Sequence, residues 1–426
     1  MKNLLLPFYL LYSLLLVAQS TQVNYDEALV PTYELPPLLG FANGDSIEQL
    51  TRWPVRRQQL LKLFGEHVYG HRPSADIDVS FRTTKEVNGS LRGLADLREV
   101  DIVLRGAADS LVVPLLLYLP VGRSGPVPVM LGLNFYGNHI VSSDPNISLP
   151  TSWIANIDEF HITDNRATDA SRGARAYRWD IEQVLARGYA FATVYYGDLD
   201  PDRPDHWQDG VHPLFYRVGQ TRPDPSQWGA IGAWAYGYSR AVDYLLQDGD
   251  IDPNRIVAMG HSRIGKAVLW AGANDERIAL VIANNSGCGG AALSRRDYGE
   301  TVKIINGNFP HWFNDRFVDY GDRVQELPVD QHELIALLAP RPVYIASAIE
   351  DRWADPRGEF LAAYYAGAAY QLFGLMTIKN IEMPPLNHAV EHTVVGYHLR
   401  EGGHGVTPYD WTQYLDFADH HLSVIR

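Results

Sequence analysis

Cysteine is nearly absent from this chain of 426 residues, in which Cys288 is the only one. A single cysteine cannot form a disulfide bond within its chain, and a thiolate metal centre needs several cysteines at ligand spacing. The sequence therefore excludes a disulfide framework and gives no indication of a thiolate metal site. Because Cys288 stands among glycines and alanine, we interpret it as a small side chain packed in the core.

Long hydrophobic runs are missing after the first twenty residues. The run from Leu4 to Val17 follows a lysine and ends at the small residues Ala18 and Ser20, which is the pattern of an export signal. We expect residues 1–20 to be a signal peptide cleaved after Ser20, with the mature protein periplasmic or extracellular. The run is too short to span a bilayer comfortably, so a lasting membrane anchor is not expected.

Basic residues are fewer than acidic ones: 36 lysines and arginines stand against 50 aspartates and glutamates, a net charge of −14. This charge repels nucleic acid and anionic lipid surfaces, so neither is an expected partner. Linkers rich in proline, serine or glycine, repeats and low-complexity runs are also missing. We therefore expect residues 21–426 to form a single domain, with a monomer as the working expectation.

Short apolar runs predict the buried strands of an α/β protein. Between them lie helix-like segments, of which residues 228–247 repeat apolar side chains every three or four positions. This alternation favours a three-layer sandwich with a mostly parallel central sheet, and ligands of such sheets bind beyond the carboxyl ends of the strands. The predicted strands are 112–119, 127–133, 189–196, 255–259, 279–283 and 341–348.

A serine motif follows the predicted strand at 255–259, in the segment Gly260-His261-Ser262-Arg263-Ile264-Gly265-Lys266. A serine between a strand and a helix, with small residues about two positions to either side, is typical of the nucleophile elbow of the α/β-hydrolase fold. Gly260 meets the first requirement, but Ile264 occupies the usual second glycine position and Gly265 follows it. We predict that Ser262 is a nucleophile and that the next helix begins near Ala267.

A serine nucleophile needs a histidine base and an acid that orients it, in the chain order Ser, Asp or Glu, His. For the acid, Asp351 follows the predicted strand 341–348 and is preferred over its neighbours Glu350 and Asp355; Asp355 precedes Pro356 and is a plausible helix N-cap. For the base, spacing favours His404, which lies in a glycine-rich loop, but spacing alone does not identify the base. The other candidates are His388, His392 and His398.

Beyond these motifs, nearly the whole mature chain resembles the glucuronoyl esterases of carbohydrate esterase family 15, specifically their bacterial branch. The Ser-Arg-x-Gly-Lys arrangement after the elbow is highly specific to this family and accounts for Ile264. The segments that carry the resemblance are Asn134 to His139, Tyr196 to Asp202, Gly260 to Lys266, Ser286 to Gly290, Leu327 to Asp330 and Trp353 to Pro356.

The resemblance implies an enzyme that needs no metal or cofactor and hydrolyses esters between 4-O-methyl-glucuronic acid of xylan and lignin alcohols. It implies Ser262 as the nucleophile and His404 as the base, with Arg263 directed at the developing oxyanion. It also implies a substrate-binding role for Lys266, Glu300 and Trp353. The helix macrodipole disfavours cations at the start of a helix, so the presence of Arg263 and Lys266 there needs another cause. The negative charge that the reacting carbonyl acquires provides one.

One departure concerns the acid. Fungal members carry a glutamate just before the Ser-Gly-x-Gly-Gly stretch, where this chain has Asn285, and they carry cysteine where it has His261. Because asparagine cannot stabilise an imidazolium as a carboxylate does, the acid is expected from the later strand, as in many bacterial members, which supports Asp351. The alternatives in function are an acetylxylan esterase and, from another class, a carbohydrate-binding protein without catalysis.

Overall fold

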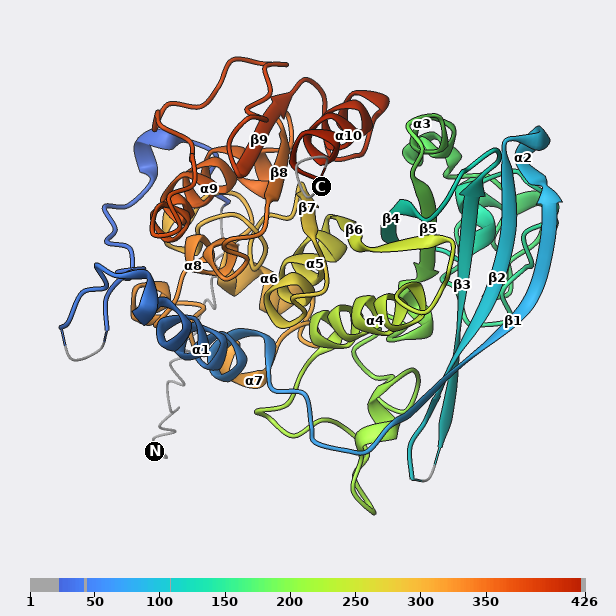
Figure 1. The fold of residues 1–426 in the computed structure, drawn as a ribbon. Helices are drawn as coiled ribbons and strands as arrows, with labels where there is room; N and C mark the ends of the chain where they lie inside the picture. The colour runs from blue at the N-terminus through green and yellow to red at the C-terminus, as the bar shows by residue number, and fades with distance from the viewer. Residues whose placement is uncertain (1–22, 42–43, 108, 423–426) are drawn as a thin grey trace, which may run out of the picture.

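The structure is a computed structural model that describes residues 23–41, 44–107 and 109–422. In these residues nine strands form one sheet in the order β1-β2-β3-β5-β4-β6-β7-β8-β9 (Figure 1). The strands are β1 (Asp78–Gly89), β2 (Ala95–Arg105), β3 (Ser110–Pro120), β4 (Val127–Asn134), β5 (Ala190–Tyr195), β6 (Ile251–His261), β7 (Leu280–Asn284), β8 (Val343–Ala348) and β9 (Val395–Arg400).

The sheet has a parallel part and an antiparallel part. All pairs from β5 through β4 to β9 are parallel, whereas β1, β2 and β3 form an antiparallel meander that joins the sheet through the antiparallel pair β3 and β5. Every residue of β5, β7, β8 and β9 is buried. Strands covered on both faces are expected to be almost continuously apolar, which is why the sequence revealed most of them.

Helices cover both faces of the sheet. On one face α4 packs on α5, and α5 contacts β6 and β7; on the other α3 and α10 lie together (Figure 1). The helices of the described residues are α1 (Trp53–Phe64), α2 (Ser90–Gly93), α3 (Ile181–Ala186), α4 (Ala230–Leu245), α5 (Arg263–Asn274), α6 (Val302–Asn308), α7 (Asp315–Val318), α8 (Gln331–Ala336), α9 (Pro356–Gln371) and α10 (Pro408–Leu422).

This arrangement confirms the predicted three-layer α/β fold with a mostly parallel central sheet. Each of the six predicted strands coincides with a strand of the sheet within a few residues, and the predicted helix at 228–247 is α4. The sequence did not reveal β1, β2 or β9. The proposed signal peptide at residues 1–20 lies outside the described residues.

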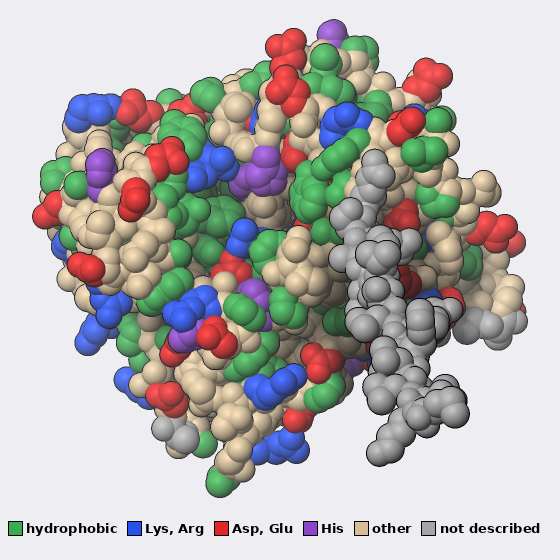
Figure 2. Space-filling model, turned by 180° about the vertical axis from the view of Figure 1, so that it is seen from behind, with side chains coloured by type: hydrophobic (Ala, Val, Ile, Leu, Met, Phe, Trp, Pro, Cys, Tyr) green, Lys and Arg blue, Asp and Glu red, His purple; other side chains and the backbone are tan. Residues whose placement is uncertain are grey.

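Surface charge is distributed in small groups. On the face shown in Figure 2, acidic and basic side chains are interspersed, and histidine, cationic and acidic side chains surround a hollow near its centre. Within the part of the chain that the structure describes, no helix is both long and apolar enough to cross a membrane.

Candidate active site

Ser262 occupies a strained turn between β6 and α5. Its backbone has φ 59° and ψ −128°, a region that non-glycine residues rarely adopt, and this exposes the side chain at the end of the strand. A Cβ on Gly260 would lie 2.2 Å from the carbonyl oxygen of Ile264, and one on Gly265 would lie 2.8 Å from Cβ of Ser286. The second small residue that the elbow needs is therefore Gly265, and Ile264 is buried in the core.

The helix after the elbow begins earlier than the sequence suggested. We expected it near Ala267, whereas α5 starts at Arg263, directly after the serine. Because Gly265 has no side chain, the first turn of α5 packs closely against Ser286 and no extended bridge is needed. In this first turn the N–H groups of Gly265 and Lys266 donate to the carbonyl of Ser262, so the N–H groups of Arg263 and Ile264 are the donors left beside the serine.

His404 connects Ser262 to Asp351. Its Nε2 lies 2.9 Å from Oγ of Ser262, and its Nδ1 lies 2.6 Å from Oδ2 of Asp351. A carboxylate only accepts hydrogen bonds, so Nδ1 carries the proton and Nε2 accepts from the serine hydroxyl. The structure thus brings together the three residues that the sequence proposed as nucleophile, base and acid.

Asp351 is held in its ionised form. Burial raises its pKa, but hydrogen bonds from His404 and from Nδ2 of Asn285 outweigh burial and keep the pKa below its ordinary value. The two alternative acids lie elsewhere: Glu350 is exposed, and Asp355 caps α9 by accepting from the N–H of Gly358.

The other candidate bases do not contact Ser262. His388 and His392 are exposed, and Nδ1 of His388 bonds the carbonyl of Leu386. His398 is buried in β9, where its Nε2 lies 2.9 Å from Oδ1 of Asp410. Asp410 also binds Arg400 at 2.7 Å.

Arg400 in turn supports the loop that carries His404. Its guanidinium donates to the carbonyls of Glu401, Gly403 and Gly405. The buried residues of β9 therefore fix the position of the exposed imidazole that follows.

Arg263 lies between a carboxylate and an aromatic ring. Its Nη1 donates to Oδ2 of Asp202, and its guanidinium carbon lies 4.8 Å from the centroid of the Trp312 ring. As the first residue of α5, Arg263 adds a full positive charge to the N–H donors beside Ser262.

The residues expected to bind substrate form a second pair of charges. Lys266 is buried; its Nζ donates to the carbonyl of Ser286 at 2.5 Å and lies 3.8 Å from Oε2 of Glu300. Burial lowers the pKa of Lys266 and raises that of Glu300, and in each case the partner's charge opposes the effect. The N–H of Glu300 donates to the carbonyl of Trp353, whose side chain remains 37% exposed.

Comparisons with known proteins identify the family to which the chain belongs. A family model described as glucuronyl esterase, fungi, matches residues 205–374. A carbohydrate esterase of an unknown prokaryotic organism is 47% identical over 407 residues, which cover 95% of this chain and 94% of the relative. The chain belongs to carbohydrate esterase family 15. The predicted resemblance is thereby confirmed, and the protein is a carboxylic ester hydrolase.

Two solved structures of the family superimpose on most of the chain. One is a promiscuous esterase of this family from a marine bacterial metagenome, with 47% identity, a TM-score of 0.87, and coverage of 94% of this chain and 100% of that one. The other is a glucuronoyl esterase from Solibacter usitatus, with 44% identity, a TM-score of 0.87, and coverage of 93% and 100%.

Two positions that the sequence analysis singled out as departures from fungal members, Asn285 and His261, lie against Asp351 and His404. Asn285 donates to Asp351, as described above. The ring of His261 lies 4.5 Å from that of His404, its Nδ1 bonds Oδ1 of Asn284 at 2.6 Å, and its Nε2 accepts from Arg178 at 2.9 Å. Burial lowers the pKa of His261 well below its ordinary value, so this ring stays neutral beside the base.

Sequence reasoning missed the residues that surround Arg263. Asp202 belongs to the segment from Tyr196 to Asp202 that carried the resemblance, but no role was assigned to it. Trp312 and its neighbour His311 lie in a loop with no motif. Their contribution depends on the fold, which brings both loops to the start of α5.

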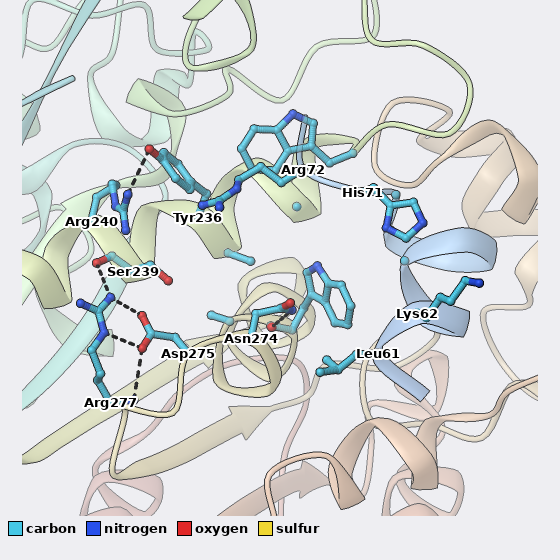
Figure 3. Close-up of a pocket in the computed structure, with 17 residues that line it drawn as sticks. Leu61, Lys62, His71, Arg72, Tyr236, Ser239, Arg240, Asn274, Asp275 and Arg277 are labelled. Carbon is cyan, nitrogen blue, oxygen red and sulfur yellow. Dashed lines mark hydrogen bonds and ion pairs between the residues drawn. The ribbon is translucent and has the colours of Figure 1, made fainter. Parts of the chain in front are cut away.

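A separate groove lies away from this site. It has a volume of about 680 Å³, lies between α1, α4 and α5, and is lined by Lys62, Arg72, Tyr236, Arg240 and Asn274 among others (Figure 3). Asn274 is the last residue of α5, a helix of 12 residues, which places this end of the groove about 18 Å along the helix from Ser262. No nucleophile with a histidine partner lies there in the described residues, and none of these residues form a cluster arranged to bind a metal.

Proposed function

We propose that the protein is a serine esterase that hydrolyses ester bonds between 4-O-methyl-glucuronic acid of xylan and alcohols of lignin, through an acyl-enzyme on Ser262. The observation that carries the proposal is the continuous hydrogen-bonded chain from Asp351 through His404 to Ser262, with Arg263 at the start of the adjoining helix. The substrate follows from the family, since the solved relative from Solibacter usitatus is a glucuronoyl esterase.

In the first half of the reaction, Nε2 of His404 takes the proton of Ser262 as Oγ attacks the C6 ester carbonyl. The carbonyl oxygen becomes an oxyanion, which Arg263 and the first N–H groups of α5 stabilise. Asp351 stabilises the imidazolium that forms. The C–O bond to the alcohol then breaks, and His404 returns the proton to the departing alkoxide oxygen.

In the second half, His404 takes a proton from a water molecule, and the resulting hydroxide attacks the acyl-enzyme carbonyl. The tetrahedral oxyanion forms at the same donors, and the bond to Ser262 breaks as His404 protonates Oγ. The products are a free uronic acid and the regenerated serine.

The two sides of the site suit the two parts of this ester. Lys266, Glu300 and the exposed face of Trp353 supply hydrogen bonds and an aromatic wall for the sugar. Because His404 protonates the leaving group, the alcohol departs on its side, where the ring of His261 contacts that of Phe135 and bonds Arg178. Aromatic rings and guanidinium groups favour an aromatic alcohol.

The test compares wild-type protein with Ser262→Ala, using the exposed Ser110→Ala as a matched control. Benzyl glucuronate and acetylated xylan are assayed side by side. We expect kcat/KM to favour the glucuronate, the Ser262 variant to lose nearly all activity, and the control to keep it. Retention of most activity by Ser262→Ala would refute the mechanism.

The same assays separate the alternatives. The metagenome relative is described as promiscuous, so acetyl esters are a real competitor; a higher kcat/KM on acetylated xylan would make the protein an acetylxylan esterase. A fluorophosphonate that labels wild-type protein but not Ser262→Ala demonstrates an activated serine. Sugar binding without labelling would instead indicate a binding protein.

We further propose that residues 1–20 are removed on export, that residues 21–426 fold as a single domain, and that the mature protein is a monomer. The apolar run from Leu4 to Val17 supports export, and the single continuous sheet supports one domain. N-terminal sequencing of secreted protein and sedimentation equilibrium test these points. An intact Met1 on the mature protein would contradict cleavage.

A further inference from the structure

Asp202 is the acceptor that fixes Arg263. Oδ2 of the carboxylate accepts from Nη1 of the guanidinium, and the guanidinium carbon lies 4.8 Å from the centroid of the Trp312 ring. The hydrogen bond fixes one edge of the guanidinium, and the ring adds a cation–π contact.

The carboxylate of Asp202 is itself held from several directions. Its Oδ1 accepts from the indole N–H of Trp312 at 2.7 Å and from Nε2 of His311 at 2.9 Å, and its Oδ2 also accepts from the hydroxyl of Tyr196 at 3.1 Å. Only 7% of the side chain is exposed. Burial raises the pKa of Asp202, but these donors and the charge of Arg263 outweigh burial and lower the pKa, so the group is a carboxylate at neutral pH.

The number of donors around the buried carboxylate of Asp202 indicates that it does more than neutralise the charge of Arg263. Trp312 contributes twice, since its N–H binds Asp202 while its ring supports Arg263. Nε of Arg263 is buried and has no hydrogen-bond partner among the described residues. A buried donor without a partner is costly unless a ligand or a reacting group supplies the acceptor.

We propose that Asp202 is a positioning residue that holds the free edge of Arg263 toward the oxyanion formed on attack by Ser262. This inference rests on the role proposed above for Arg263. The negative charge of Asp202 weakens the field of the guanidinium, so its benefit lies in geometry: a donor that is already in place does not reorganise as the oxyanion forms.

The test is a double-mutant cycle with Asp202→Asn and Arg263→Ala, assayed with p-nitrophenyl acetate. Asp202→Asn keeps the shape of the side chain and removes its charge. We expect it to lower kcat roughly 10- to 100-fold with KM changed less than about twofold, because an oxyanion donor acts in the transition state. In the Arg263→Ala background the same substitution should lower kcat less than about twofold, because the residue through which it acts is gone.

Equal losses of kcat in both backgrounds would overturn the proposal, and so would a rise in KM at unchanged kcat. The exposed Asp205→Asn, from the same segment, is the matched control and should keep wild-type kcat. If Asp202→Asn does not fold, Trp312→Phe takes its place, because it keeps the ring under Arg263 and removes the donor to Asp202. Trp312→Phe should lower kcat less than Asp202→Asn does, and this loss should likewise disappear in the Arg263→Ala background. A loss of kcat that persists in that background would overturn the proposal.

The choice of substrate keeps this test separate from that of the proposed function. p-Nitrophenyl acetate and the rate of fluorophosphonate labelling report on the serine and its oxyanion donors without involving the sugar. Coupling between Asp202 and Arg263 in a protein that does not cleave glucuronate esters would refute the proposed substrate and leave the positioning role intact.

Discussion

Asn285 donates a hydrogen bond of 2.6 Å to Oδ2 of Asp351, the same oxygen that accepts from His404. The residue that stands in place of the fungal acid therefore touches the acid that this chain uses in our proposal. Its amide cannot carry the negative charge of the triad, but it orients the group that does.

Replacement of Asn285 by glycine should lower kcat roughly tenfold, because a hydrogen bond to a charged group is worth about 1.5–3 kcal/mol and part of it is lost to water. Glycine is chosen because the backbone here has φ 45°, which alanine would strain. Loss of the donor raises the pKa of Asp351, so the acid limb of the pH–rate profile should move to higher pH. Asn387→Gly, at an exposed position with φ 61°, is the matched control. A kcat within twofold of wild type would show that Asn285 does not orient Asp351.

Replacement of Asp351 by asparagine should reduce kcat by about 10³- to 10⁴-fold with little change in KM, since the imidazolium loses its stabilising charge and the histidine its tautomer. Steady-state kinetics on benzyl glucuronate measure the loss. Glu350→Gln, the exposed neighbour, should keep full activity. The reverse result, with the larger loss in the Glu350 variant, would move the acid to that residue.

The sequence predicted the elements whose residues are uniformly apolar and missed those whose burial alternates or whose buried residues are polar. β5 and β8 are buried at every position and were found; β1 mixes exposed and partly buried residues and has no fully buried one. β9 was missed because it contains His398 and Arg400, which are buried only because Asp410 satisfies them. A partner from α10 cannot be recognised from the strand alone.

For the site, the order of motifs indicated Ser262 and the segment of the acid, because each follows a predicted strand at the same sheet edge. Spacing could not identify the base among four histidines. His398 bonds Asp410 and His404 bonds Ser262, and these are tertiary contacts that spacing does not show. The elbow motif also placed the start of α5 too late, because the close approach of Gly265 to Ser286 is a tertiary contact.

Replacement of Gly260 by alanine should unfold the elbow or destabilise the protein by several kcal/mol, because the new methyl group would meet the carbonyl of Ile264 at 2.2 Å. Urea unfolding followed by tryptophan fluorescence measures the change. Gly249→Ala is the control, since no atom lies within 4 Å of its Cβ position. If both variants unfold at the same urea concentration, the elbow is not as tightly packed as described.

Burial raises the pKa of Asp198 to about 7, above the value of ~3.9 for an unfolded chain. Between these two values the folded protein binds a proton that the unfolded chain releases, so this group makes stability fall as pH rises from ~4 to about 7. Asp198→Asn should remove that contribution, roughly 1.4 kcal/mol for each unit of pKa difference, and make the variant relatively more stable at pH ~8 than at pH ~4. Urea unfolding at both pH values provides the measurement, with the exposed Asp205→Asn as the control. An unchanged difference between the two pH values would show that Asp198 does not titrate with folding.

The proposed base is made long after the proposed nucleophile: His404 follows β9, the last strand of the described residues, and lies 142 residues after the serine with which it bonds. A ribosome that stops before this point releases a polypeptide that has Ser262, Arg263 and Asp351 but no group to take the serine proton. Under the proposed mechanism, such incomplete translation products have no esterase activity. Hydrolytic activity in a culture would consequently report how much folded chain extends past His404, whereas an antibody against the first strands would count the fragments as well.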